Sequence, residues 1–288
     1  MTIYSISIVT SSGFPFYQKK ILPLPKGIRL NLRFFDYTDY FYIDQDCLET
    51  SNAFELNAGL ISALYEFSKN IEKRIYSLEF KSLDDKDYNK DVLRGEKYEG
   101  DALITTETEV YLLNKSIEAK VNLIYNTIIK PKIPLESCIC ISSEEENKLL
   151  DLLTDKKAKR RLKKIHFALE RQAQEFLNIM GNYGLFNIVI SSFDLSPILV
   201  FGEKYTFDEI EIILRNMGEV PQIPPMEWKH RQSFIKDRTI WVYIINSGVG
   251  VTVNNLFEPY FYLLFTDTQS YLGEFPLKLI NKFNLIIS

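Results

Sequence analysis

The chain has 288 residues, of which 46% are apolar, 25% charged and 14% aromatic. This composition can fill the cores of two ordinary domains and is not that of a disordered chain. A net charge of −4 argues against a general nucleic-acid coat, and three cysteines without framework spacing argue against a disulfide scaffold. Since no apolar run is long enough to span a membrane, we expect a soluble cytoplasmic protein.

The first half begins with a predicted β-hairpin. β-Branched and aromatic residues favour a strand over 3–10, the turn Ser11-Ser12-Gly13 follows, and the chain can return as a strand over 14–22. Prolines then break regular pairing. We interpret residues from about 28 to 50 as an aromatic insert, which contains Phe34, Phe35, Tyr37, Tyr40, Phe41 and Tyr42.

The rest of the first half supplies a helix, three strands and a second helix. Asn52 and Glu55 have the residue types of a capping box, which predicts a helix over 53–71. Alternating residues predict three strands, the last two forming a hairpin around Glu107-Thr108-Glu109. Ser116 can cap a closing helix that prolines end. The strands are expected over 75–81, 102–106 and 110–113, and the closing helix over 116–130.

Residues 143–181 form a predicted helical connector. Three glutamates follow Ser143, and acidic side chains stabilise a helix start. Helix-forming residues continue to Met180, and Gly181 offers a stop. A break near Thr154-Asp155 gives one bent helix or two consecutive helices.

The second half repeats the kinds of element found in the first. Thr206-Phe207-Asp208-Glu209 is a full capping box and predicts a helix ending near Met217. Gly248-Val249-Gly250 lies between two strand-like segments and indicates a hairpin turn. The other expected elements are strands over 186–191, 198–201, 239–246, 249–253 and 260–265, and a helix over 269–284 that bends near Pro276.

A short repeat supports a duplication. Ile8-Val9-Thr10-Ser11-Ser12 is echoed by Ile188-Val189-Ile190-Ser191-Ser192. Five residues alone are weak evidence, because such strand endings are common. Both halves, however, show the predicted order β-β-α-β-β-β-α. We therefore expect two α/β (α+β) modules over 1–135 and 182–288, joined by the connector.

This order resembles the profilin-like longin/roadblock superfamily, whose modules have a five-stranded antiparallel sheet with helices packed on it. The helix before the second half resembles the extra leading helix of roadblock domains. The resemblance implies a non-enzymatic protein without cofactor or metal. Its partner would be a small Ras-like GTPase or another longin/roadblock subunit, in the setting of vesicle trafficking. Tandem longin modules in particular resemble activators that load GTPases with nucleotide.

The predicted helix over 53–71 has two apolar stripes, whereas a helix lying on one sheet needs only one. Leu56, Leu60, Ala63, Leu64, Phe67 and Ile71 form the first stripe. The second is a candidate partner-binding surface, although the aromatic insert is an equal alternative cover. It consists of Phe54, Ala58, Ile61 and Tyr65.

A basic run from Lys156 to Lys164 is a candidate contact for an anionic membrane surface. A nucleic-acid backbone is a rival partner, and a solvated helix face balanced by neighbouring acids is the structural alternative. The candidate residues are Lys156, Lys157, Lys159, Arg160, Arg161, Lys163 and Lys164.

The search for chemistry yields no catalytic, cofactor-binding or metal-binding residues. His166 and His230 are the only histidines and have no partners at ligand spacing. Cys138-Ile139-Cys140 has no second cysteine pair with which to complete a zinc site. A small-molecule sensor of PAS or GAF type stays open as an alternative, as does an enzyme with an unrecognised site.

Overall fold

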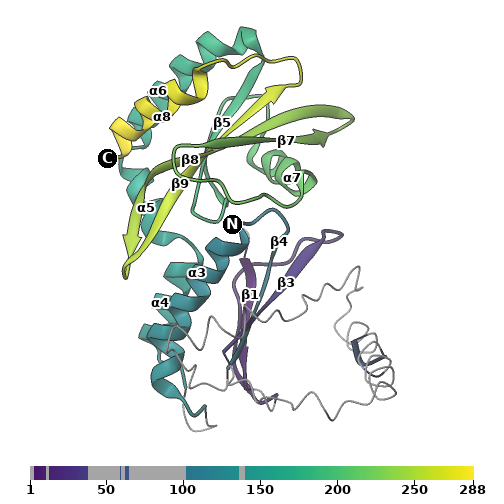
Figure 1. The fold of residues 1–288 in the computed structure, drawn as a ribbon, viewed down its shortest axis with the longest axis vertical. Helices are drawn as coiled ribbons and strands as arrows, with labels where there is room; N and C mark the ends of the chain where they lie inside the picture. The colour runs from purple at the N-terminus through teal and green to yellow at the C-terminus, as the bar shows by residue number, and fades with distance from the viewer. Residues whose placement is uncertain (1–2, 11–12, 38–58, 60–61, 65–101, 136–139) are drawn as a thin grey trace, which may run out of the picture. The chain divides into compact units, whose positions relative to one another are not determined.

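The fold is mixed α/β and contains two antiparallel sheets, of four and five strands (Figure 1). Both sheets belong to one compact unit made of residues 1–37 and 100–288, and residues 38–99 form another unit. The predicted helix over 53–71 and strand over 75–81 therefore lie almost entirely outside the described residues. The computed structural model describes residues 3–10, 13–37, 59, 62–64, 102–135 and 140–288.

The first sheet has the strand order β2-β1-β4-β3. The predicted hairpin β1–β2 is confirmed. Residues expected in the aromatic insert form β3 instead, which pairs with β4 along its whole length. The strands are β1 (Ile3–Val9), β2 (Pro15–Lys20), β3 (Leu30–Asp36) and β4 (Leu103–Glu109).

The hairpin expected around Glu107 is wrong, because β4 continues through it. Glu107 pairs with Ser5 on one side and with Leu32 on the other. Thr106 and Thr108 point into the protein and are fully buried. Glu107, between them, is only partly buried, so residues 106–108 follow the inside–outside pattern of one strand and do not form a turn.

The closing helix of the first half begins earlier than predicted and is irregular at its end. Helix α3 (Asn114–Ile124) starts after Leu113, and Ser116 is buried in its first turn and does not act as the cap. A π-helical turn (Tyr125–Ile129) and a 3-10 turn (Lys130–Lys132) extend it. The ring of Tyr37, just beyond β3, stacks on Tyr125 with centroids 3.9 Å apart, which ties the helix to the sheet.

The connector consists of three helices and not of the one or two expected. The predicted break near Thr154-Asp155 is confirmed, and a second break at Ile165 was not predicted. Asp155 separates α4 from α5 in a left-handed backbone conformation with φ of 55°. The cap of α4 is Ser142, one residue before the position predicted, and it forms a capping box with Glu145. The helices are α4 (Ser143–Leu153), α5 (Lys156–Lys164) and α6 (His166–Met180).

The second sheet has the order β6-β5-β9-β8-β7. Helix α7 has the predicted cap and end, whereas α8 begins later than expected, with Pro276 in its first turn. The strand β7 was missed because its five successive residues 229–233 are all polar and hide any apolar alternation. The elements are β5 (Leu185–Ser191), β6 (Pro197–Phe201), α7 (Phe207–Met217), β7 (Trp228–Ile235), β8 (Arg238–Val253), β9 (Leu256–Asp267) and α8 (Phe275–Ile287).

The hairpin turn predicted at Gly248 is also wrong. Strand β8 passes through it, and its pairing with β9 shifts register between Asn246 and Gly250. A side chain at Gly250 would place its Cβ 2.0 Å from the carbonyl oxygen of Glu258. The glycines therefore permit a bulge and a close approach of two strands.

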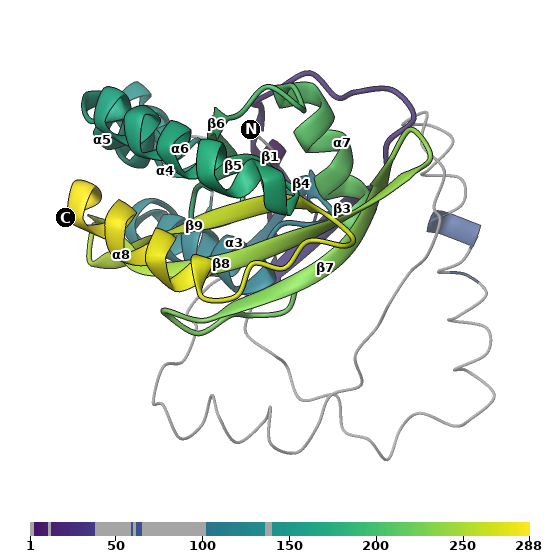
Figure 2. The same cartoon turned by 90° about the horizontal axis from the view of Figure 1, so that it is seen from above.

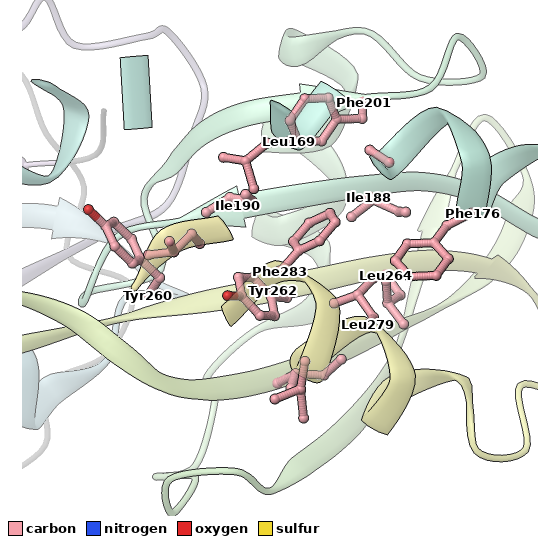
Figure 3. Close-up of a cluster of buried hydrophobic side chains, with 14 of the residues drawn as sticks. Leu169, Phe176, Ile188, Ile190, Phe201, Tyr260, Tyr262, Leu264, Leu279 and Phe283 are labelled. Carbon is pink, nitrogen blue, oxygen red and sulfur yellow. The ribbon is translucent and has the colours of Figure 1, made fainter. Parts of the chain in front are cut away.

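Helices cover both faces of the second sheet (Figure 2). On one face, α6 and α8 enclose an apolar cluster in which Phe176 and Phe283 lie over Tyr262 and Leu264 (Figure 3). On the other face lies α7, where the Ser233 hydroxyl of β7 donates to the carbonyl oxygen of Ile213 at 2.6 Å. Strand β9 is buried on both sides, which explains its unbroken apolar run.

The two N-terminal hairpins share their register and their irregularities. Val9 pairs with Pro15 after a bulge, and Ser191 pairs with Pro197 after the same bulge. Gly13 and Leu195 occupy the same turn position, with φ of 84° and 76°.

The strands on the other side of β1 and β5 also match, because β4 pairs with β1 in the same way as β9 pairs with β5. The pairing of β1 with β4 shifts between Ile3 and Ser5, and that of β5 with β9 shifts between Leu185 and Asn187. By these registers, the counterpart of Ile8 is Ile190. The sequence echo matched Ile8 to Ile188, which is two residues away from the structural counterpart. A shift of two residues along a strand keeps each side chain on the same face of the sheet.

Candidate functional site

The predicted partner-binding stripe cannot be placed. Phe54, Ala58, Ile61 and Tyr65 lie outside the described residues. Gly59 and residues 62–64 are helical, in agreement with a helix in this segment. The stripe stays a prediction.

Helix α5 places the basic run, and the structure divides its seven cations into two groups. Its inward residues Ala158 and Leu162 are buried, which anchors the helix. Four of the cations are engaged within the protein. Lys156 pairs with Asp151, Lys157 donates to the carbonyl oxygen of Thr252, Lys159 donates to that of Thr154, and Arg161 donates to those of Ile287 and Ser288.

These four contacts have a structural explanation. The guanidinium of Arg161 satisfies carbonyl oxygens at the end of α8, where the helix dipole favours a cation. Lys159 does the same at the end of α4, at 2.7 Å from the Thr154 oxygen. These four cations join the connector helices to each other and to the second sheet and α8.

Arg160, Lys163 and Lys164 form the second group. All three are exposed, and within the part of the chain that the structure describes they have no ion-pair partner. Phe167, nearby in sequence, is 86% exposed. An open hollow of about 450 Å³ adjoins Lys163 and His166 and is otherwise lined mainly by apolar residues of β6 and by Phe207. An anionic contact stays a prediction, and these three residues are its remaining candidates.

A buried ionic cluster was not foreseen. The Lys120 ammonium of α3 lies 2.6 Å from a carboxylate oxygen of Asp155 and 2.6 Å from one of Asp194. The three side chains are almost fully buried. Asp155 belongs to the α4–α5 break and Asp194 to the turn between β5 and β6, so one ammonium joins the first half, the connector and the second half.

The surroundings of this cluster shift several pKa values. Burial raises the pKa of Glu258, on β9, to about 7, against the opposing charge of Lys120. Burial likewise raises the pKa of Asp155 to about 6. The pKa of Asp194 falls despite burial, because Lys120, Ser192 and Ser196 stabilise its charged form. The pKa of Lys120 is raised, since the neighbouring carboxylates outweigh its desolvation.

This cluster is a junction within the fold, because it is closed to solvent. Perturbed pKa values indicate a functional site only where a cleft gives a substrate access, and the carboxylates here face Lys120. A sequence signal did exist. Lys120 lies on the same face of α3 as Ile117, Val121 and Ile124, and a cation within an apolar stripe requires a buried partner.

A second ionic contact joins the same regions. Glu109, at the end of β4, is fully buried and accepts a hydrogen bond at 2.8 Å from Arg215 of α7. The Tyr4 hydroxyl of β1 donates to the same carboxylate oxygen. Helix α7 therefore contacts the first sheet as well as its own.

No protein-family model matches the chain, and no curated protein matches it. Across the described ranges, none of the helices combines the length and apolar character needed to cross a bilayer. The same residues hold no group of three or more histidine, cysteine, aspartate or glutamate side chains arranged to bind a metal ion.

Proposed function

We propose that the chain is a non-enzymatic adaptor with two modules of longin/roadblock type, and that it binds or regulates a small Ras-like GTPase or pairs with another subunit of this kind. The observation that carries the proposal is the matched register of β2-β1-β4 and β6-β5-β9, including both bulges. Irregularities at equivalent positions on both sides of the central strand favour a repeated module over two independent sheets.

The second half supports the module type. It has five antiparallel strands, with α7 on one face and α8 on the other. Helix α6 precedes the sheet and packs on it, which corresponds to the leading helix of roadblock domains. The first half departs from this pattern, because four strands are described there and β3 lies before the segment 38–101.

The mechanism would be recognition through surfaces. A protein that promotes nucleotide release does so by binding one state of the GTPase more tightly than another. No proton transfer or covalent step by this chain is required. The ionic junction around Lys120 would hold the two sheets in a fixed relation while a partner is bound.

The test uses the full chain and a panel of purified Ras-like GTPases, each loaded with GDP or with a GTP analogue. We expect at least one to bind with different affinity in its two states, as measured by biolayer interferometry, and release of a fluorescent nucleotide shows whether exchange is stimulated. Ile61→Asp and Tyr65→Asp should weaken binding, and Ser62→Asp, at an exposed position, is the matched control.

Two results would contradict the proposal. The first is the absence of binding to every GTPase while circular dichroism shows a folded chain. The second is equal binding by all three variants, which would remove the second stripe from the interface.

A further inference from the structure

The outer end of the second sheet carries an aromatic surface. Both tryptophans of the chain lie here, Trp228 on β7 and Trp241 on β8. His230 sits between them and packs edge-on against Trp241 at 5.0 Å and at a tilt against Tyr243 at 5.6 Å. His230 is paired with Tyr243 across the strands, so these rings share one face of the sheet.

This face is uncovered at its edge. Farther in, α6 and α8 cover it, but residues 228–232 of β7 are exposed. The loop from β9 to α8 borders the edge (Figure 2) and presents Tyr271, which is 82% exposed. Trp228, Tyr243 and Tyr271 line a hollow of about 350 Å³, together with Ser270, Glu274 and Pro276. Exposed tryptophan and tyrosine are the residues that most often dominate binding surfaces.

The hollow contains several groups that can donate hydrogen bonds, namely one indole N–H and three hydroxyls. Among the described residues, the Trp228 indole N–H and the hydroxyls of Tyr243 and Tyr271 have no hydrogen-bond partner. The hydroxyl of Ser270 is buried and also lacks one. By contrast, the Trp241 indole donates to the carbonyl oxygen of Thr268 at 3.2 Å. Glu274 adds one negative charge to the hollow. Among the described residues it has no ion-pair partner.

We infer that this hollow, the Trp228–Tyr271 site, binds a proline-rich segment in the polyproline II conformation with a basic residue beside it. Such a segment has free carbonyl acceptors and few N–H donors, and the indole N–H and hydroxyl groups of the hollow can donate to these carbonyls. Its proline rings pack flat against aromatic side chains. The basic residue would pair with Glu274. This inference does not depend on the proposed function.

The experiment uses the full chain and a synthetic peptide of ten prolines followed by two lysines. In the Trp241→Phe variant, Trp228 is the sole tryptophan, and we expect its fluorescence to change saturably as peptide is added. Calorimetric titration then compares variants. Trp228→Phe keeps a ring but removes the N–H and should weaken binding roughly tenfold, the size of one hydrogen bond. Trp228→Ala and Tyr271→Ala should weaken it more.

The controls separate recognition from general adhesion. Trp241→Phe should bind as the unaltered chain does, because its indole N–H already has a partner. Glu274→Gln should weaken binding of the lysine peptide and leave a peptide of ten prolines alone unaffected. The thermal unfolding midpoints of the Trp228, Tyr271 and Glu274 variants should agree with that of the unaltered chain, since these side chains are exposed. The midpoint of Trp241→Phe should fall slightly, because the variant loses the hydrogen bond to Thr268.

Three outcomes would overturn the inference. One is no saturable change in the fluorescence of Trp228. Another is equal affinity for a glycine–serine peptide carrying the same two lysines. The third is saturable binding of an oligosaccharide or a mononucleotide, lost in Trp228→Ala, when the proline peptide does not bind.

Discussion

The two sheets share a register but differ in how many layers they support. Thr105 of β4 and Leu263 of β9 occupy equivalent positions, paired with Ser7 and Val189. Leu263 is fully buried under α7, whereas Thr105 is only partly buried. On the same face of the first sheet, Phe34 of β3 is 65% exposed.

The difference separates two properties of a strand, namely its pairing register and the alternation of its side chains. Pairing register depends on the backbone, the bulges and the turn, and it is the same in both halves. Side-chain alternation depends on whether a second layer covers the sheet. In β4, Leu103, Thr105 and Glu107 share a face and stay partly exposed, whereas β9 is apolar and buried on both faces. A similar backbone can therefore underlie sequences that share almost no letters.

The largest effect should come from the contact that joins the two sheets. Lys120→Met leaves the buried carboxylates of Asp155 and Asp194 without their cation, and breaking such a contact from one side costs about 3–5 kcal/mol. We expect the urea midpoint to fall by a corresponding amount. We also expect hydrogen exchange to become faster in both β1 and β5.

A combined variant provides the control. Lys120→Met with Asp155→Asn and Asp194→Asn removes the charges together and should recover part of the lost stability, since no buried charge is left unpaired. If Lys120→Met alone leaves the free energy of unfolding unchanged, the junction does not couple the sheets.

The equivalent positions in β4 and β9 allow a matched pair of truncations. Leu263→Ala empties a space between the second sheet and α7, and a buried leucine truncation costs about 2–5 kcal/mol. Thr105→Ala removes a partly exposed hydroxyl and methyl and should cost about 1 kcal/mol or less. Chemical denaturation of both variants measures the difference. Similar losses at the two sites would mean that the first sheet has a second cover after all.

Much of the second half was predictable from local signals. The capping box at Thr206 correctly predicted that α7 is a helix and where it begins, because the hydrogen bonds of a capping box involve only neighbouring residues. The break at Asp155 was predictable for the same reason. The hairpins predicted at Glu107 and Gly248 failed, since charged residues and glycines also occur within strands, and only the partner strand distinguishes a bulge or an exposed face from a turn.

The candidate sites were harder to predict, because they depend on contacts between distant segments. The basic run could be recognised in the sequence, but the division of its cations into an engaged group and an exposed group could not. The capping role of Arg161 depends on the end of α8, far away in sequence. The aromatic surface also needs β7 beside β8 and the loop after β9, and β7 itself was missed. Lys120 did have a local signal, because it is a cation within an apolar helix face.

A smaller expected effect than the loss of Lys120 is a pH dependence where the second sheet meets the junction. Glu258 of β9 has its pKa raised to about 7 by burial, above the ordinary value of 4.5. Between these two pH values the unfolded chain ionises this carboxyl while the folded chain keeps it protonated. Folding stability should therefore fall as the pH rises through this interval.

Glu258→Gln should remove that fall, because its amide cannot ionise. We expect the variant to exceed the unaltered chain by about 1–3 kcal/mol at pH 8 and to match it near pH 4.5. The groups facing Glu258 are Lys120, Asp155, Asp194 and Lys157, and Asp155, with its pKa raised to about 6, adds a decline of the same sign. The measurement is urea denaturation at several pH values. Parallel pH profiles for the two proteins would show that Glu258 is ionised in the folded state.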